Sequence, residues 1–184
     1  GHSFTPAAAT DGLLVSLDDL TGVEAIVPTS DAEGRVVGAD VTEWSGTRLH
    51  RLGPLLWDLG LAQPNLGDFA EQSLAGTHGT GHSAPGLPAT VVGLQIVTAD
   101  GSVLSCSRDS HPEVFEAARL GIGALGIITK MTLRCVPAFA LRAEEEPWTL
   151  SAALADLEGF AHSADHAEFF WFPHTDAINV KRNT

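Results

Sequence analysis

The sequence predicts a mixed α+β fold, and two patterns in its 184 residues carry that prediction. The first is a series of short apolar runs separated by turn signals, which is typical of strands. The second is a set of leucines at steps of three and four residues, which is typical of one face of a helix. With 44% hydrophobic residues, the chain is expected to be globular and long enough to bury a core.

The first 45 residues predict short strands. Apolar runs at 13–17, 23–27 and 36–41 each have the length of a strand, and we expect the first to be buried. Asp11-Gly12 is a turn signal before the first run, and the polar stretch 31–34 separates the last two. Strands this short and this closely spaced favour a mixed or antiparallel sheet over a long parallel one.

A helix is expected to follow these strands. Thr47 is a candidate cap for it, and Leu59 is its expected last residue. Pro54 would bend or split this helix, and Gly60 would end it. Its leucines recur along one side, at positions 49, 52, 56 and 59. We interpret these leucines as core residues.

A hairpin is predicted in the middle of the chain. Ala99-Asp100-Gly101 is a turn signal between two apolar runs, at 91–98 and 102–107. The residues before the first run, 84–88, are expected to form a loop.

A helix and a strand are expected after the hairpin. Pro112 in the first turn, with Ser110 as a cap, predicts a helix that runs to about Arg119. A loop at 121–126 then leads into a strand at 127–136.

The last 40 residues predict a second domain. The charged stretch 144–147 is interpreted as a solvated break, which divides the chain into domains 1–143 and 144–184. Thr149 would cap a helix whose apolar residues at 150, 154, 157 and 160 share one face. Two strands are expected after it, at 168–172 and 178–181.

Composition excludes several classes of function. The net charge is −13, with 10 Lys and Arg against 23 Asp and Glu, which argues against a nucleic-acid partner. No apolar run approaches the length of a membrane span, and the amino terminus does not resemble a secretory signal. Cys106 and Cys135 are interpreted as small core residues that do not demand an oxidising compartment. The cytoplasm is therefore the expected location.

A stretch rich in small residues, 67–81, is the first candidate for a binding site. It reads G-D-F-A-E-Q-S-L-A-G-T-H-G-T-G and includes three hydroxyl side chains, of Ser73, Thr77 and Thr80. Glycines let backbone N–H groups approach an anion closely, and hydroxyls add further donors. The composition is therefore typical of a turn that holds a phosphate, although small-residue turns without a ligand are also common.

Three separate motifs together resemble a known family. They are G-H-S-F-T-P at 1–6, L-A-G-T-H-G-T-G at 74–81 and G-A-L-G-I-I-T at 123–129. In this order they resemble the PCMH-type FAD-binding domain of the vanillyl-alcohol-oxidase superfamily. Within that superfamily the chain is most similar to the aldonolactone oxidoreductases, which act on L-gulono-1,4-lactone or D-arabinono-1,4-lactone, with alditol oxidases as near relatives.

The resemblance implies both a fold and an activity. It implies an α+β FAD-binding domain of the PCMH type that lacks its amino-terminal βα part, followed by the start of an α+β cap domain. It also implies hydride transfer from a sugar-lactone or polyol hydroxyl to N5 of FAD, with oxygen, a cytochrome or a dye as electron acceptor. The alternative is that Gly1 and His2 are left over from cloning and precede the natural start of the protein.

The resemblance also assigns cofactor-binding residues. His2 would be bonded through a ring nitrogen to the C8 methyl of the flavin, and Gly1 and Ser3 would lie against the pyrophosphate or the flavin edge. The backbone of Gly126, Ile127 and Ile128 would border the adenine or ribose. A second phosphate wall would be formed by Ser73, Gly76, Thr77, His78, Gly79, Thr80 and Gly81.

Two features limit what the resemblance implies. In relatives, several small residues separate the L-A-G and T-H-G-T-G parts, whereas Gly76 and Thr77 are adjacent here. A shorter segment would shift backbone donors on the flavin side by about 3.3 Å per missing extended residue. The catalytic groups of the family lie mainly in later segments, so no catalytic base is assigned.

Two other classes of function stay open at this point. A metal hydrolase could use His78 and His82, or His162 and His166 on one face of a helix, although no third ligand follows at a suitable distance. The chain could also be a module that holds FAD or a related dinucleotide without turnover. Yellow colour retained in an acid precipitate would favour the flavoprotein.

Overall fold

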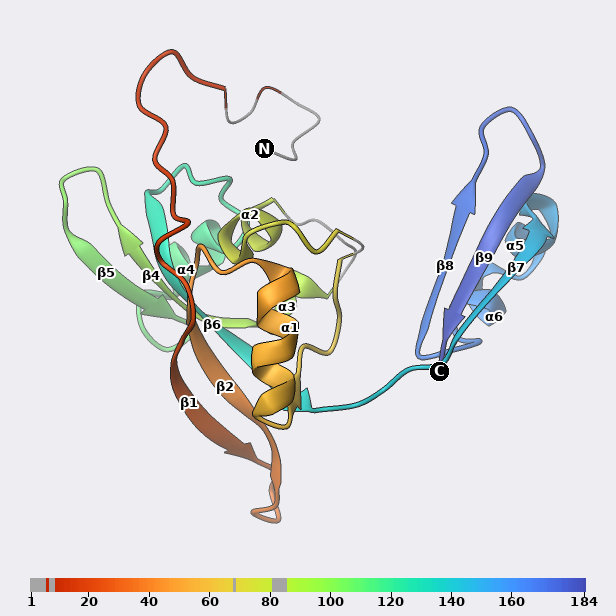
Figure 1. Ribbon diagram of the computed structural model, residues 1–184, viewed down its shortest axis with the longest axis horizontal. Coiled ribbons are helices and arrows are strands. Elements are labelled where there is room, and N and C mark those ends of the chain that lie inside the picture. The colour runs from red at the N-terminus through yellow and green to blue at the C-terminus, as the bar shows by residue number, and fades with distance from the viewer. Residues whose placement is uncertain (1–5, 7–8, 68, 81–85) are drawn as a thin grey trace. The chain divides into compact units, whose positions relative to one another are not determined.

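A computed structural model describes residue 6 and residues 9–67, 69–80 and 86–184 (Figure 1). The chain divides into two compact units, Gly1–Ala138 and Phe139–Thr184. Each unit has its own sheet and its own apolar core. We describe them separately as the first unit and the second unit.

An antiparallel sheet forms the frame of the first unit (Figure 1). Its strands follow the order β1-β2-β6-β4-β5, so the long strand β6 lies at the centre between β2 and β4. A two-residue strand, β3, pairs with the end of β6. The bounds are β1 Val23–Ser30, β2 Val36–Trp44, β3 Leu61–Ala62, β4 Val91–Val97, β5 Val103–Ser107 and β6 Ile127–Pro137. The antiparallel sheet expected from the short, closely spaced runs is confirmed.

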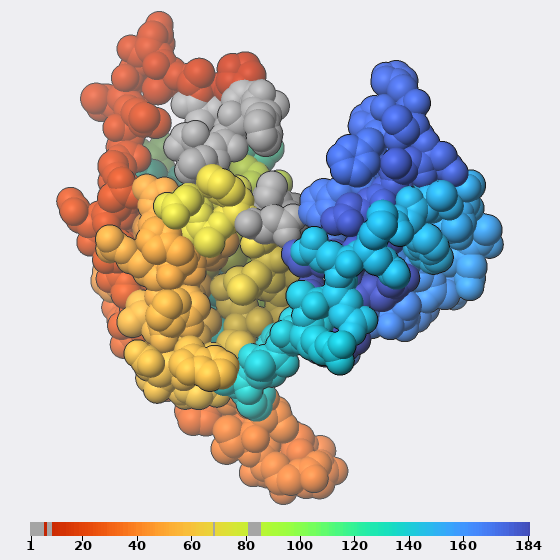
Figure 2. Space-filling model, turned by 45° about the vertical axis from the view of Figure 1, so that its right-hand side comes forward, coloured from red at the N-terminus to blue at the C-terminus, as the bar shows by residue number. Residues whose placement is uncertain are grey.

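Helices and the inner face of this sheet enclose the first core. On β2 the buried residues alternate, with Ala39 and Val41 facing inward, as expected for a strand with one solvated face. Leu52 and Leu56 from α1 and Leu74 from α2 are fully or almost fully buried against them. The four helices are α1 Leu49–Asp58, α2 Leu74–Gly79, α3 Leu87–Thr90 and α4 Pro112–Ala118. Figure 2 shows α1 in orange on the surface of this unit, with the tip of the β1–β2 hairpin extending beyond it.

The second unit is a small α+β layer. Its sheet has the order β7-β9-β8, and both pairs of neighbours are antiparallel. The bounds are β7 Ala143–Thr149, α5 Leu150–Ala155, α6 Leu157–Ala161, β8 His166–Trp171 and β9 Ala177–Asn183. Ala153 and Phe160 from the helices pack with Ile178 and Val180 from β9.

Several predicted elements of the first unit need correction. The run 13–17 is not a buried strand: Leu13 and Leu14 are 95% and 80% exposed, because no neighbouring strand of the described chain pairs with them. Thr47 does not cap α1. Its hydroxyl accepts from the N–H of Gly22 and donates to the carbonyl of Trp44.

The structure also corrects the predicted ends of α1 and α4 and of the loop before α3. Leu59 lies outside α1 and is 45% exposed, although Gly60 does end the helix in a left-handed conformation. Ser110 is not the cap of α4, since His111 occupies that position. Within the expected loop 84–88, residues 87 and 88 begin the short helix α3.

The second unit differs from its prediction at two places. The charged stretch 144–147 lies inside strand β7, and the division between the units falls earlier, after Ala138. Thr149 caps a helix as expected, through a bond from the N–H of Ala152. The single helix predicted after it is two helices, because the carboxylate of Asp156 accepts from the N–H of Gly159 and starts α6 anew.

Two further expectations concern the cysteines and the membrane. Cys106 and Cys135 are both free and buried, as predicted for core residues. Across the residues that the structure describes, no helix combines the length and the apolar character needed to span a bilayer.

Candidate functional site

Residues Leu74–Gly79 of the small-residue stretch fold as the helix α2. Ser73 caps α2, since its hydroxyl accepts from the N–H of Gly76 at 3.4 Å. The hydroxyl of Thr77 donates to the carbonyl of Ser73 at 3.0 Å, and that of Thr80 donates to the carbonyl of Gly76 at 2.8 Å. Two of the three hydroxyls expected to face a phosphate therefore bond to carbonyls one turn back along the chain.

Burial divides α2 into two sides. Thr77, His78 and Gly79 are buried, whereas Gly76 and Thr80 are exposed. The exposed side therefore offers glycine backbone and a threonine to a ligand. The buried side anchors the helix in the core.

His78 is a neutral histidine with one unused nitrogen. Its side chain is fully buried, and burial lowers its pKa to about 4. Nδ1 lies 3.0 Å from the carbonyl oxygen of Leu74, so Nδ1 carries the hydrogen and Nε2 is the acceptor. Nε2 has no hydrogen-bond partner among the described residues.

The end of α2 is joined to the glycine-rich loop before β6. The N–H of Ile122 donates to the carbonyl of Gly79 at 3.1 Å. Within that loop, Gly126 has φ 137°, and a Cβ there would lie 2.4 Å from the carbonyl oxygen of Val97. Only glycine allows this approach, so the entry to β6 is fixed against β4.

Ser45 joins the start of α2 to the start of β6. Its carbonyl accepts from the N–H of Ala75 at 2.9 Å, and its N–H donates to the carbonyl of Thr129 at 3.0 Å. Its buried hydroxyl donates to the carbonyl of Ile128 at 2.5 Å. The two segments assigned to the second phosphate wall and to the adenine or ribose therefore lie side by side, with Ser45 between them.

The remaining candidate residues have different positions. Ile128 is buried in the core, whereas Ile127 is 40% exposed. Gly1, His2, Ser3 and Gly81 lie outside the described residues.

These uncharged segments fit a diphosphate-containing cofactor such as FAD, because neutral N–H and O–H donors can bind the anionic oxygens. Neither 73–80 nor 121–128 contains a charged residue. Gly123 is exposed, and no described atom outside its chain neighbours lies within 4 Å of the position that a Cβ would take there, so its backbone can be approached closely. The Nε2 acceptor of His78, buried and unpartnered among the described residues, is a further polar group at this site.

Sequence reasoning missed a buried carboxyl beneath this site. Glu43 lies on the inner face of β2, two residues before Ser45, and is fully buried. Neither of its carboxyl oxygens has a hydrogen-bond partner among the described residues, and burial raises its pKa to about 8. The alternation of β2, with Ala39 and Val41 facing inward, was the available signal.

The metal-hydrolase alternative finds no support in the described chain. His162 follows the end of α6 and His166 begins β8, so the two do not share a helix as expected. His82 lies outside the described residues. The part of the chain that the structure describes contains no group of three His, Cys, Asp or Glu side chains suited to a metal.

Two family models match the chain. The model described as FAD binding domain matches residues 1–107. The model described as D-arabinono-1,4-lactone oxidase matches residues 131–184, which include the whole second unit.

Named relatives are similar along nearly the whole chain. The L-gulonolactone oxidase of Scyliorhinus torazame is 36% identical over 185 residues, which covers 98% of this chain and 40% of the relative. The L-gulono-1,4-lactone dehydrogenase of Mycobacterium tuberculosis is 39% identical over 181 residues, covering 96% and 40%. The D-arabinono-1,4-lactone oxidase of Yarrowia lipolytica is 33% identical over 180 residues, covering 95% and 34%. The chain thus spans at most 40% of the length of these relatives.

A solved structure has the same fold. The cholesterol oxidase of B. sterolicum matches with a TM-score of 0.77 at 19% identity, over 100% of this chain and 38% of that one. The predicted α+β, PCMH-type FAD-binding fold is confirmed. Because the FAD binding domain model matches 107 of the 184 residues, the chain belongs to the FAD-binding domain family, and the relatives named above are lactone oxidases and dehydrogenases.

Proposed function

We propose that this chain is the FAD-binding part of an enzyme that oxidises a hydroxyl of an aldono-1,4-lactone. One observation supports the site: Ser45 hydrogen-bonds both the start of α2 and the start of β6, so two uncharged motifs meet. The names of the relatives support the substrate class. FAD, when bound, would accept at N5 a hydride from the hydroxyl-bearing carbon, while the hydroxyl proton leaves and a ketone forms.

The exposed side of α2 is assigned to the diphosphate. The hydroxyls of Thr77 and Thr80 already bond to carbonyls of Ser73 and Gly76. The N–H groups of Gly76 and Thr77 likewise already donate to Ser73. We therefore assign diphosphate binding to the exposed side of α2 around Gly76 and Thr80, with the Thr80 hydroxyl as an adjustable donor. We assign a role in the shape of the second phosphate wall to its other residues, Ser73, His78, Gly79 and Gly81.

The other assignments follow the motifs. Gly126, Ile127 and Ile128 border the adenine or ribose, and Gly1 and Ser3 contact the pyrophosphate or flavin edge. His2 carries the covalent bond to the flavin. The first unit, Gly1–Ala138, is assigned to the FAD-binding domain, and the second unit, Phe139–Thr184, to the start of the substrate domain. The substrate is a sugar lactone, the electron acceptor is oxygen, a cytochrome or a dye, and the compartment is the cytoplasm.

The covalent bond has a direct test. Purified protein is precipitated with acid, and the flavin absorbance of pellet and supernatant is measured. We expect colour in the pellet of the wild type and only in the supernatant for His2→Ala. Pellet-bound colour in His2→Ala would remove His2 from this role.

The activity is tested on the full-length protein that contains this chain. We expect L-gulono-1,4-lactone or D-arabinono-1,4-lactone to reduce an artificial dye, and a polyol such as xylitol to do so more slowly. Faster reduction with the polyol would favour an alditol oxidase. FAD binding without reduction by any of them would leave a binding module and contradict the proposed activity.

A further inference from the structure

One short connection bonds to three separate segments of the first unit. The connection comprises residues 45–48, between β2 and α1, and we refer to it as the β2–α1 connection. Ser45 ties it to Ala75 of α2 and to Ile128 and Thr129 of β6. The third segment, 17–22, follows the G-H-S motif along the chain.

Backbone contacts hold segment 17–22 against this connection. The N–H of Gly46 donates to the carbonyl of Leu20 at 3.0 Å, and the N–H of Gly22 donates to the hydroxyl of Thr47 at 2.9 Å. A Cβ on Gly46 would lie 1.8 Å from the carbonyl oxygen of Leu17. The two backbones therefore approach more closely than any side chain at position 46 would allow.

Arg48 adds a side-chain link between segment 17–22 and the residues just before α2. One guanidinium nitrogen, Nη1, donates to the carbonyl of Glu71 at 3.0 Å. Nη2 donates to the carboxylate of Asp18, and this bond is the main reason that the pKa of Asp18 lies below its usual value. The backbone of Arg48 also forms an isolated antiparallel bridge with Ser73, the cap of α2.

We propose that Arg48 is a positioning residue, which sets the segment after the G-H-S motif in register with the start of α2. The inference rests on the proposed function, because it concerns how the segments that would hold FAD are aligned. A guanidinium presents five donors in a rigid plane and can bond both partners at once. The ammonium of lysine is a single point and does not reproduce both bonds.

The contribution of Arg48 has a limited size. The side chain is one third exposed and that of Asp18 is 61% exposed, so the ion pair adds little to global stability. The backbone bonds of residues 45–47 would still hold the fold when Arg48 is replaced. The Arg48→Met variant is therefore expected to fold. In it, the position of segment 17–22 relative to Ser73 should be less restrained.

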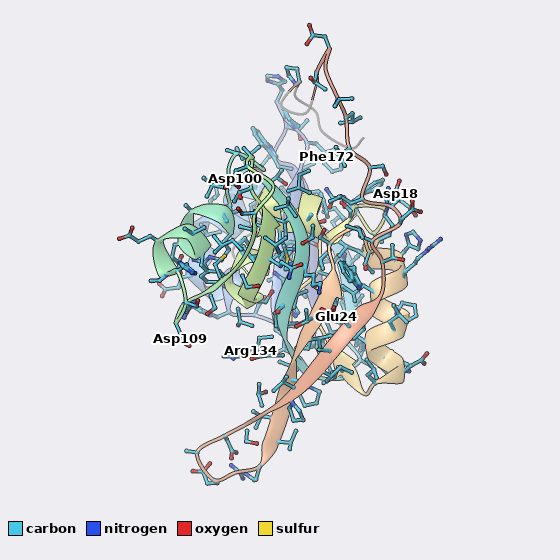
Figure 3. The ribbon with its side chains drawn as sticks, turned by 90° about the vertical axis from the view of Figure 1, so that its left-hand side faces the viewer. Asp18, Glu24, Asp100, Asp109, Arg134 and Phe172 are labelled. Carbon is cyan, nitrogen blue, oxygen red and sulfur yellow. The ribbon has the colours of Figure 1, made fainter. Side chains whose placement is uncertain are left out.

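The test compares two arginines of the first unit. Arg134 forms two bonds of 2.9 Å to Asp40 across β2 and β6, but it links neither segment 17–22 nor α2. Figure 3 labels Asp18 and Arg134, which lie at separate places on this unit. Arg134→Met thus removes an arginine–aspartate pair without touching the β2–α1 connection.

The measurements are made on flavin-free protein from a riboflavin-starved host. The Kd for FAD is obtained from quenching of flavin fluorescence, with every variant and its reference carrying His2→Ala so that the flavin can dissociate, and Tm is recorded for each variant. We expect Arg48→Met and Asp18→Asn each to weaken FAD binding about tenfold, with the double variant no weaker than Arg48→Met. Arg48→Lys should recover part of the affinity, and Arg134→Met should bind as the reference does.

Hydrogen exchange supplies a readout that does not need FAD. The amides of Gly22 and Gly46 should exchange faster in Arg48→Met, while amides in β4 and β5 stay protected. If the wild type fails to bind FAD, the proposed function fails, and this exchange pattern still tests the positioning role. Unchanged exchange and unchanged Kd in Arg48→Met, or equal loss of affinity in Arg134→Met, would overturn the inference.

Discussion

The N–H of Ile122 donates to the carbonyl of Gly79, which brings the end of α2 to the loop that enters β6. These residues are 43 positions apart in the sequence; Gly79 lies in the motif 74–81, and Ile122 directly precedes the motif 123–129. Because Ser45 ties the other end of α2 to Ile128 and Thr129, the two motifs are held at two points. The loop geometry and the Ser45 bonds are therefore the features whose removal should disturb the site most.

Gly126 and Gly123 form a matched pair for testing the loop. Both have positive φ, 137° and 74°, but only Gly126 is crowded, by the carbonyl oxygen of Val97 and by Ile96. We expect Gly126→Ala to lower the free energy of unfolding by about 3 kcal/mol, since strain and a clash add. Gly123→Ala should cost about 1 kcal/mol, from backbone strain alone. Urea unfolding measures both, and equal losses would contradict this account.

Glu43 is expected to make stability depend on pH. Its pKa is about 8 in the folded protein against 4.5 ordinarily, so the unfolded chain releases the proton first as the pH rises. Its contribution to stability is full below about pH 4.5 and falls by about 1.4 kcal/mol per pH unit until about pH 8.

Glu43→Gln removes this ionisation while keeping the shape of the side chain. The free energy of unfolding of the variant relative to the wild type should therefore increase between about pH 5 and about pH 8. Urea titrations across that range provide the comparison, and other titrating groups cancel in the difference. A difference that stays constant would show that Glu43 is not buried as an acid.

His78 is expected to act in the opposite direction at lower pH. Its pKa is about 4 in the folded protein against 6.5 ordinarily, so the unfolded chain takes up the proton first as the pH falls. The contribution of His78 to the free energy of unfolding falls as the pH is lowered from about 6.5 to about 4. Between about pH 4.5 and pH 6.5 the contribution of Glu43 changes in the opposite direction, so the two changes cancel in the wild type. The free energy of unfolding of His78→Gln relative to the wild type should therefore increase as the pH falls from about 6.5 to about 4, as measured by urea titrations. Acid sensitivity equal to that of the wild type would contradict a buried neutral histidine.

Much of the fold could be predicted from local patterns. The strands of the first unit follow from apolar runs between turn signals, and the hairpin around Asp100 follows from its turn residues. The run 13–17 has the same composition, but a strand also needs a partner, and an apolar run does not say whether one lies beside it. Asp156 shows the reverse case, since its side chain caps α6 inside a run that has a helical period.

The motifs of the candidate site could be predicted from the sequence, but the hydrogen bonds that join them could not. Glycine-rich motifs around Gly76 and Gly126 can be recognised because close approach of backbone requires particular residues. The bonds of Ser45 and Arg48 join distant segments through ordinary serine and arginine side chains, and nothing local marks them. For the same reason the hydroxyl of Thr77 was expected to face a ligand, whereas it bonds within its own helix.

Ser45→Ala tests whether the bonds of one buried hydroxyl hold the two motifs together. The Ser45 hydroxyl is fully buried, so its removal leaves the carbonyl of Ile128 without this donor in the core. We expect a loss of about 1–3 kcal/mol in the free energy of unfolding and faster hydrogen exchange at Ala75 and Ile128.

Thr42→Val is the matched control for Ser45→Ala, because it removes a hydroxyl from β2, the strand that leads into Ser45. That hydroxyl bonds Thr132 at 2.9 Å in a partly buried position, away from α2. The control should lose about 1 kcal/mol at most and leave exchange at Ala75 unchanged. If Ser45→Ala and Thr42→Val changed exchange at Ala75 equally, the hydroxyl of Ser45 would have no special role in aligning α2 with β6, and the backbone bonds of Ser45 alone would hold the two motifs.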